Sequence, residues 1–187
     1  MPKLSTAYYA LGMLKQTVSQ DIPIMIYYAY FRSLMNYGII FWGNSSYSSK
    51  VFKLQTTVVR IRTGSMSRDP GHDLFKNLNI LTLPSQYIFL LLRFLITNCD
   101  QYMFNSEIHG KNTRQITNFH QPVPNLSLYR KGILNMGIKI YNNLPSFIKR
   151  TLDNMSSKEF KSLLRNFFYS NPFYTKDEYF NHNATSW

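Results

Sequence analysis

Cysteine is nearly absent from this chain, since Cys99 is the only one among 187 residues. A single cysteine excludes an internal disulfide and cannot form a cysteine-rich zinc site. The four histidines also lack the i, i+4 helical spacing of a zinc ligand pair. A nucleophilic role for Cys99 would need an activating base that the sequence does not place beside it, so we expect an incidental thiol. The sequence predicts no metal site.

Acidic residues are also scarce, with only 9 Asp and Glu in the chain. Two-metal phosphoryl chemistry needs clustered carboxylates to hold its ions close together. Here the carboxylates are scattered singly, and the one adjacent pair is Asp177-Glu178 near the C-terminal end. No glycine-rich phosphate loop is present either. The sequence therefore predicts no catalytic residue and no cofactor in this chain, and it favours a non-catalytic role.

Basic residues dominate instead, because 21 Lys and Arg give a formal net charge of +12. Such a charge favours partners with regularly spaced negative charge, of which nucleic acid is the commonest. An anionic membrane surface, or a charge that serves solubility alone, is the alternative. The apolar stretch from Ile22 to Trp42 has the length of a membrane span, but Arg32 and Asn36 lie within it. Polar groups there are costly in lipid, so we expect no membrane partner.

Hydrophobic periodicity predicts a mainly α-helical fold. A first helix is expected over residues 4–15, a second from a cap at Ser19 or Asp21 to a break at Gly43, and a third over residues 49–63. Three helices in about 60 residues favour a compact antiparallel bundle. We therefore predict an N-terminal three-helix domain over residues 1–64.

The third helix carries the strongest functional pattern. Its spacing places four polar side chains on one face and an apolar stripe beside them. The polar face consists of Lys50, Lys53, Thr57 and Arg60, and the stripe of Val51, Leu54, Val58 and Ile61. Arg62 adds a further cation. This helix is the leading candidate for phosphate contacts, and an ordinary solvated face is the alternative.

A smaller helical region is predicted over residues 65–170. After a short helix that opens at Asp69-Pro70, a helix from Pro84 is apolar nearly all round, with a narrow polar strip of Gln86, Arg93 and Thr97. A helix of this kind is normally buried. We expect Arg93 to be partly buried and paired, with contact to a ligand as the alternative.

The remaining segments are less periodic. Residues 98–125 read as a long polar loop, which contains the candidate cations Lys111 and Arg114. A weak helix is expected over 128–141, with an irregular segment of strand character as the alternative. A capping box predicts another helix over 157–169. That last helix presents Lys158, Lys161 and Arg165 on its polar face. Residues 171–187 are expected to fray.

Three sequence blocks carry a family resemblance. They are Tyr37-Gly38-Ile39-Ile40-Phe41-Trp42-Gly43-Asn44, Leu83-Pro84-Ser85-Gln86-Tyr87-Ile88-Phe89 and Gly137-Ile138-Lys139-Ile140-Tyr141-Asn142-Asn143-Leu144-Pro145. In order and spacing they closely resemble the C-terminal part of jockey-type non-LTR retrotransposon reverse transcriptases. Thr113-Arg114 and Phe160-Lys161 agree with the same resemblance.

The resemblance implies a thumb in the first three helices, which grips a template–primer duplex of RNA or DNA by its backbone. Magnesium would belong to paired aspartates of a palm domain, and this sequence holds neither that motif nor any catalytic residue of the family. The alternative is a structural remnant, whose exposed aromatic surfaces pack on the upstream polymerase domains without independent nucleic-acid binding.

Overall fold

The computed structural model describes residues 4–6, 9, 13, 25, 27–63, 71–109, 117–122, 125–130, 132–151 and 156–184. Within these residues the fold is mainly α-helical, as predicted, and contains no β-strand beyond one isolated bridge between Phe104 and Phe119. No helix in the described part of the chain is both long and apolar enough to cross a membrane.

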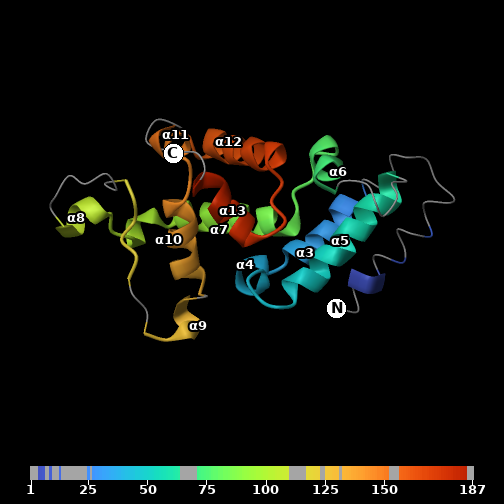
Figure 1. Ribbon diagram of the computed structural model, residues 1–187, viewed down its shortest axis with the longest axis horizontal. Coiled ribbons are helices and arrows are strands. Elements are labelled where there is room, and N and C mark those ends of the chain that lie inside the picture. The colour runs from blue at the N-terminus through green and yellow to red at the C-terminus, as the bar shows by residue number, and fades with distance from the viewer. Residues whose placement is uncertain are drawn as a thin grey trace.

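Helix α7 (Leu83–Thr97) forms the centre of the molecule. Thr82 caps it by accepting a hydrogen bond from the Ser85 amide, and Pro84 stands in its first turn. Most of its side chains are buried, as its apolar sequence predicts. Figure 1 shows α10 crossing α7, α12 running beside it, and the N-terminal helices grouped toward one end.

The N-terminal segment differs from the expected continuous second helix. It consists of a π-helical turn (Tyr27–Phe31), α3 (Arg32–Asn36) and α4 (Ile39–Trp42), followed by α5 (Ser48–Thr63). The helix breaks at Gly38, not only at Gly43, because Gly38 adopts a left-handed φ of 61°. Most of the predicted first helix lies outside the described residues, of which 4–6, 9 and 13 are helical.

The buried face of α5 also differs from the predicted apolar stripe. Val51 and Val58 are buried as expected, but Leu54 and Ile61 are only half-buried. The fully buried Gln55 takes their place at the centre of this face. Its amide nitrogen donates to the Tyr27 hydroxyl at 2.9 Å and to the Leu81 carbonyl at 2.8 Å.

The Gln55 carbonyl completes this junction by accepting a hydrogen bond from the Leu83 amide at 2.8 Å. One side chain thus joins α5 to the π-helical turn and to the start of α7. Buried hydrophobic residues form a single cluster that includes side chains from α3, α5 and α7. The boundary predicted after residue 64 therefore does not separate two cores.

Short helices make up the rest of the described chain. They are α6 (Gly71–Asn77), η2 (Cys99–Gln101), α8 (Asn105–His109), α9 (Ser127–Arg130), α10 (Ile133–Asn142), α11 (Ser146–Thr151), α12 (Ser157–Ser170) and α13 (Lys176–Ala184). The expected helix over 128–141 is thus divided into α9 and α10. The capping box predicted for α12 is present, since Ser156 and Glu159 bond each other's backbone amides.

In the region expected to be a loop over residues 98–125, the described residues are partly helical. Besides η2 and α8, it contains Phe119, which is buried. The Asn142 side chain donates to the Phe119 carbonyl and accepts from the Phe119 amide, both at 2.9 Å. The side chain of Asn142 therefore supplies a hydrogen-bond partner for both backbone groups of Phe119.

The prediction that the chain frays after residue 170 is wrong for residues 171–184. Phe173 and Tyr179 are buried in the core, and Tyr179 is on α13. The Tyr179 hydroxyl donates to the Ile140 carbonyl at 2.9 Å, and burial raises the pKa of this tyrosine. The segment folds because tertiary contacts stabilise it, although it has little amphipathic periodicity of its own.

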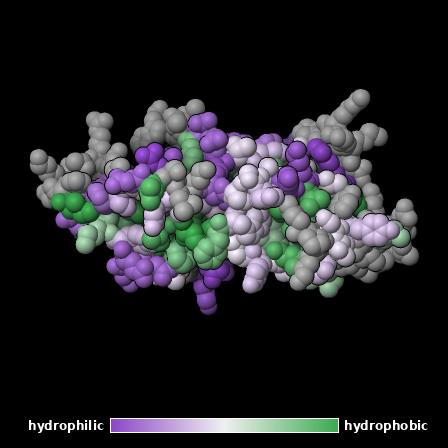
Figure 2. All heavy atoms as spheres, turned by 90° about the horizontal axis from the view of Figure 1, so that it is seen from below, coloured by the Kyte–Doolittle hydropathy of each residue, from purple (hydrophilic) through white to green (hydrophobic). Residues whose placement is uncertain are grey.

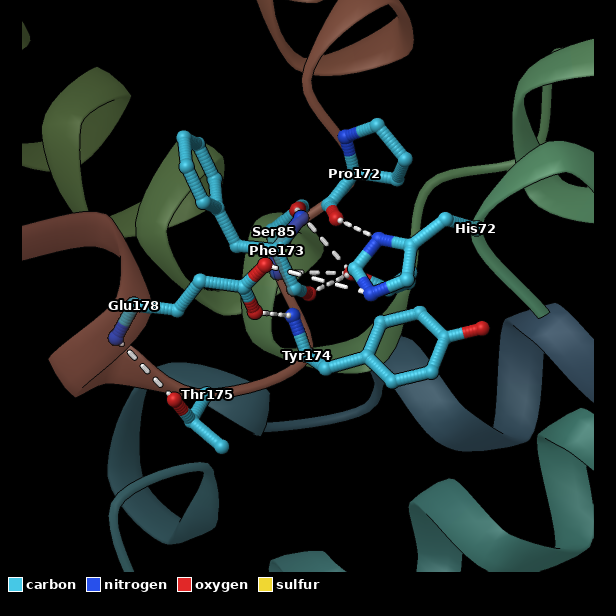
Figure 3. A network of polar contacts seen from close by, with 8 residues as sticks. His72, Ser85, Pro172, Phe173, Tyr174, Thr175 and Glu178 are labelled. Carbon is cyan, nitrogen blue, oxygen red and sulfur yellow. Dashed lines mark hydrogen bonds and ion pairs between the residues drawn. The ribbon is translucent and has the colours of Figure 1, made fainter. Parts of the chain in front are cut away.

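The same segment is bound to the start of α7 (Figure 3). Thr82 donates to the Phe173 carbonyl, and the Phe173 amide donates to the Ser85 hydroxyl at 3.1 Å. His72 on α6 contacts the Pro172 carbonyl at 2.9 Å and stacks on Tyr174 at 3.9 Å between ring centroids. The Asp177-Glu178 pair lies in the first turn of α13, and the Glu178 carboxylate accepts a hydrogen bond from the Tyr174 amide at 2.6 Å.

Gln55 provides a test of this architecture. Replacing it in Gln55→Met keeps a similar volume but leaves the Leu81 carbonyl and the Leu83 amide buried without a partner. We expect the free energy of unfolding to fall by about 3 kcal/mol, measured by urea denaturation. Lys53→Met on the exposed face of the same helix is the control, with an expected change within about 0.5 kcal/mol. Equal losses in both variants would contradict the role of the Gln55 amide.

Candidate nucleic-acid interface

Two lysines on α5 lie as the sequence predicts. Lys50 and Lys53 are exposed, together with Thr57 on the same face. The Lys50 ammonium lies 5.3 Å from the centroid of the Tyr47 ring, a cation–π contact. Neither ammonium has a carboxylate partner among the described residues. Both charges are available to an anion from solution.

Arg60 does not share this exposed face. It is half-buried, and its Nε is enclosed without a hydrogen-bond partner in the described structure. Burial raises the pKa of Tyr174, and the positive charge of Arg60 partly offsets this rise. Arg60 is therefore less accessible to a ligand than Lys50 and Lys53 are.

A second group of cations comes from α7 and α12. Arg93 and Lys161 line the same small hollow, of about 30 Å³, together with Phe89 and Phe160. The Arg165 guanidinium lies 5.8 Å from the centroid of the Phe89 ring. We call Arg93, Lys161 and Arg165 the basic patch.

The prediction that Arg93 is partly buried and paired is wrong. This residue is exposed, and no carboxylate within the described chain pairs with it. Lys161 and Arg165 are half-buried, and the Nε of Arg165 is enclosed without a partner in the part of the chain described. Lys158, one turn earlier on α12, is exposed. The patch thus holds positive charge that the described carboxylates do not neutralise.

Other predicted cations lie outside what the structure describes. Lys111 and Arg114 fall in the undescribed residues 110–116, and the side chain of Arg62 is also not described.

Three further cations contact other groups of the protein. Arg32 donates to Gln86 at 3.2 Å, and Lys139 lies 4.9 Å from the Phe180 ring centroid. Lys149 donates to the Asn118 side chain at 2.8 Å and to the Asn142 carbonyl at 2.6 Å, and burial lowers its pKa to about 8. Arg32 and Lys149 are half-buried and hydrogen-bonded, so they are poor candidates for contact with a ligand, whereas Lys139 is exposed as Lys50 is.

A cleft of about 490 Å³ lies next to the basic patch, between the α3–α4 segment and α7. Arg93 and Thr97 line both this cleft and the small hollow that contains Lys161. Phe41 and Phe94 line the cleft too, and Phe41 is 76% exposed. We call it the aromatic cleft. Sequence reasoning missed it, because only the tertiary fold brings α4 beside α7.

A larger groove of about 630 Å³ lies beyond the C-terminal end of α7, among α8, α9 and α10. Its exposed lining is apolar and includes Met103, Ile108, Leu126, Tyr129 and Leu134. Figure 2 shows hydrophobic side chains gathered on the face seen from below, near α9 and α10. We call this surface the apolar groove.

Within the described residues, no group of three or more His, Cys, Asp and Glu side chains is placed to hold a metal ion. The chain matches no protein-family model, no curated protein and no solved structure. The geometry of the cations therefore carries the functional argument.

Proposed function

We propose that this chain binds nucleic acid through phosphate contacts, without reading sequence and without catalysing a reaction. In this proposal it acts as the thumb and following region of a non-LTR retrotransposon RNA-directed DNA polymerase and holds the template–primer. The observation that carries the proposal is the basic patch, where cations of α7 and α12 meet at one hollow without a described carboxylate partner. Magnesium and catalytic carboxylates would belong to upstream polymerase domains.

The energetics of half-buried cations support a phosphate ligand. Lys161 and Arg165 have lost part of their hydration, and the described chain supplies no opposite charge in return. A bound phosphate restores a counter-charge, and a guanidinium can bond phosphate oxygens through two parallel N–H groups. Each neutralised phosphate also releases condensed counterions from the nucleic acid. Binding of this kind is strongest at low salt.

The positive net charge also favours binding of a polyanion, and it acts over longer distances than the phosphate contacts. With +12 formal charges, the protein attracts polyanions before contact and accelerates their association. Lys50 and Lys53 offer an additional exposed site on α5. Because these cations reach phosphates rather than base edges, no sequence preference is expected from them.

The basic patch gives a direct test. In the double variant Arg93→Gln/Lys161→Gln we expect weaker duplex binding on every sequence, and a slope of log K against log salt that is smaller by about two. Fluorescence anisotropy across a salt titration measures both. The matched control is Arg150→Gln/Lys76→Gln, which removes the same charge from exposed positions on α11 and α6. The proposal fails if the two double variants lose affinity equally, or if wild-type binding is independent of salt.

The second candidate function is packing on the upstream polymerase domains, and the apolar groove favours it. Monomeric proteins seldom expose large contiguous apolar patches, and those that do usually use them for interaction. Leu126, Tyr129 and Leu134 are all more than half exposed at the groove. Under this candidate the described surface is an interface with the fingers–palm segment that the family resemblance implies.

Binding to a fingers–palm fragment of a related polymerase separates the two candidates. If the groove is an interface, Leu134→Asp should weaken binding to that fragment by at least about tenfold, since it places a charge in an apolar contact. The control is Phe147→Asp, at a side chain 57% exposed on α11. Isothermal titration calorimetry measures both. Absence of binding by the wild-type chain contradicts this candidate. It does not affect the proposal of phosphate binding, which the salt titration tests.

A further inference from the structure

We infer that the aromatic cleft takes one unstacked base of a single strand whose phosphates lie on the basic patch. This inference rests on the proposed nucleic-acid binding and adds a specific ligand class, a single-stranded segment. The cleft and the hollow of the basic patch share Arg93 and Thr97 in their linings. A strand that contacts Arg93 through a phosphate therefore has the cleft within reach of its adjoining base.

The walls of the cleft suit a planar ring. Phe41 on α4 is 76% exposed, and Phe94 on α7 is 36% exposed. The apolar residues Ile39 and Leu90 also line the cleft. Exposed aromatic side chains next to a cationic groove are the usual platform for bases of a single strand. At about 490 Å³, the cleft also falls within the range typical of small-ligand sites.

The break in the helix opens this space. Gly38 lines the cleft, and its φ of 61° separates α3 from α4. Any L-residue would be strained at this φ. The glycine leaves the position open and lets the chain turn between Asn36 and Phe41.

Asn36 adds a polar group to an otherwise apolar wall. Its side-chain oxygen is buried and has no hydrogen-bond partner in the described structure. A base reaches this oxygen only after the Asn36 side chain rotates toward the cleft that it lines, and the oxygen then gains the hydrogen bond that it lacks. Each of the four common bases carries an N–H group on its Watson–Crick edge, so this contact requires a base without selecting among them.

The same two features discriminate against a duplex. In paired nucleic acid the Watson–Crick edge is used by the opposite base, and the ring faces are covered by neighbouring pairs. Only an unpaired base presents both a free ring face to Phe41 and a free N–H group to Asn36. The site is therefore suited to a template overhang or another single-stranded segment beside a duplex held by phosphates.

The test compares two single strands of about ten nucleotides, a length within the range that single-strand sites cover. One carries normal bases, and the other has the same phosphates with abasic sugars. We expect the wild-type chain to bind the normal strand about tenfold more tightly, because stacking contributes only there. Phe41→Ala should remove most of this ratio, and Asn36→Leu should reduce it about threefold. Arg93→Gln should weaken both strands alike.

Phe147→Ala is the matched control, since Phe147 is an exposed aromatic residue on α11, outside the cleft. Because Phe41 is also largely exposed, its removal should leave the thermal unfolding midpoint within a few degrees of wild type. Equal salt-dependent binding of both strands by the wild type overturns the base site and keeps the proposed function. Salt-independent or absent binding of both strands overturns the two together. A ratio that Phe147→Ala lowers as much as Phe41→Ala also overturns the base site.

Discussion

The buried amide of Gln55 fixes the relation between the two halves of this fold. It bonds Tyr27 on one side and the Leu81 and Leu83 backbone on the other. Such an amide is costly to bury unless its donor and acceptor are both used, so it permits few alternative registers between α5 and α7. The positions of Lys50 and Lys53, on the opposite face of α5, follow from that register. The placement of the exposed cations therefore depends on a neutral polar group in the core.

The three sequence blocks that carry the family resemblance meet at α7. A Cβ atom on Gly43 would lie 2.4 Å from the Tyr87 ring, so the first block packs directly on the second. On Gly137 it would lie 3.2 Å from Leu95, which brings the third block against the same helix. Gly43 and Gly137 therefore allow close packing against α7, and the three blocks contribute to the packing of the helices around it. The cations of the basic patch are not all in these blocks: Arg93 lies between the second and the third, whereas Phe41 of the aromatic cleft belongs to the first.

Features with local causes could be predicted from the sequence, and features with distant causes could not. The apolar run of α7 and the Ser156–Glu159 capping box act within a few residues, and both are present in the structure. The tail beyond Ser170 folds because Tyr179 reaches α10 and Phe173 reaches the cap of α7. Neither partner is near in sequence. Among the candidate cations, spacing identified the exposed Lys50 and Lys53, but it could not show that Arg60 is half-buried with its Nε enclosed.

The surroundings of each cation decide what it can do in this protein. Lys149 is half-buried, yet two carbonyl oxygens accept its hydrogen bonds, so its charge stabilises a junction between segments. Arg93 leaves an apolar helix for the surface and meets no such acceptor in the described structure. Of the two, Arg93 is the one whose charged end is exposed without a carboxylate partner in the described structure. A chain with few acidic residues cannot pair most of its cations internally, and the ones left at the edge of a cleft form the surface best suited to a polyanion.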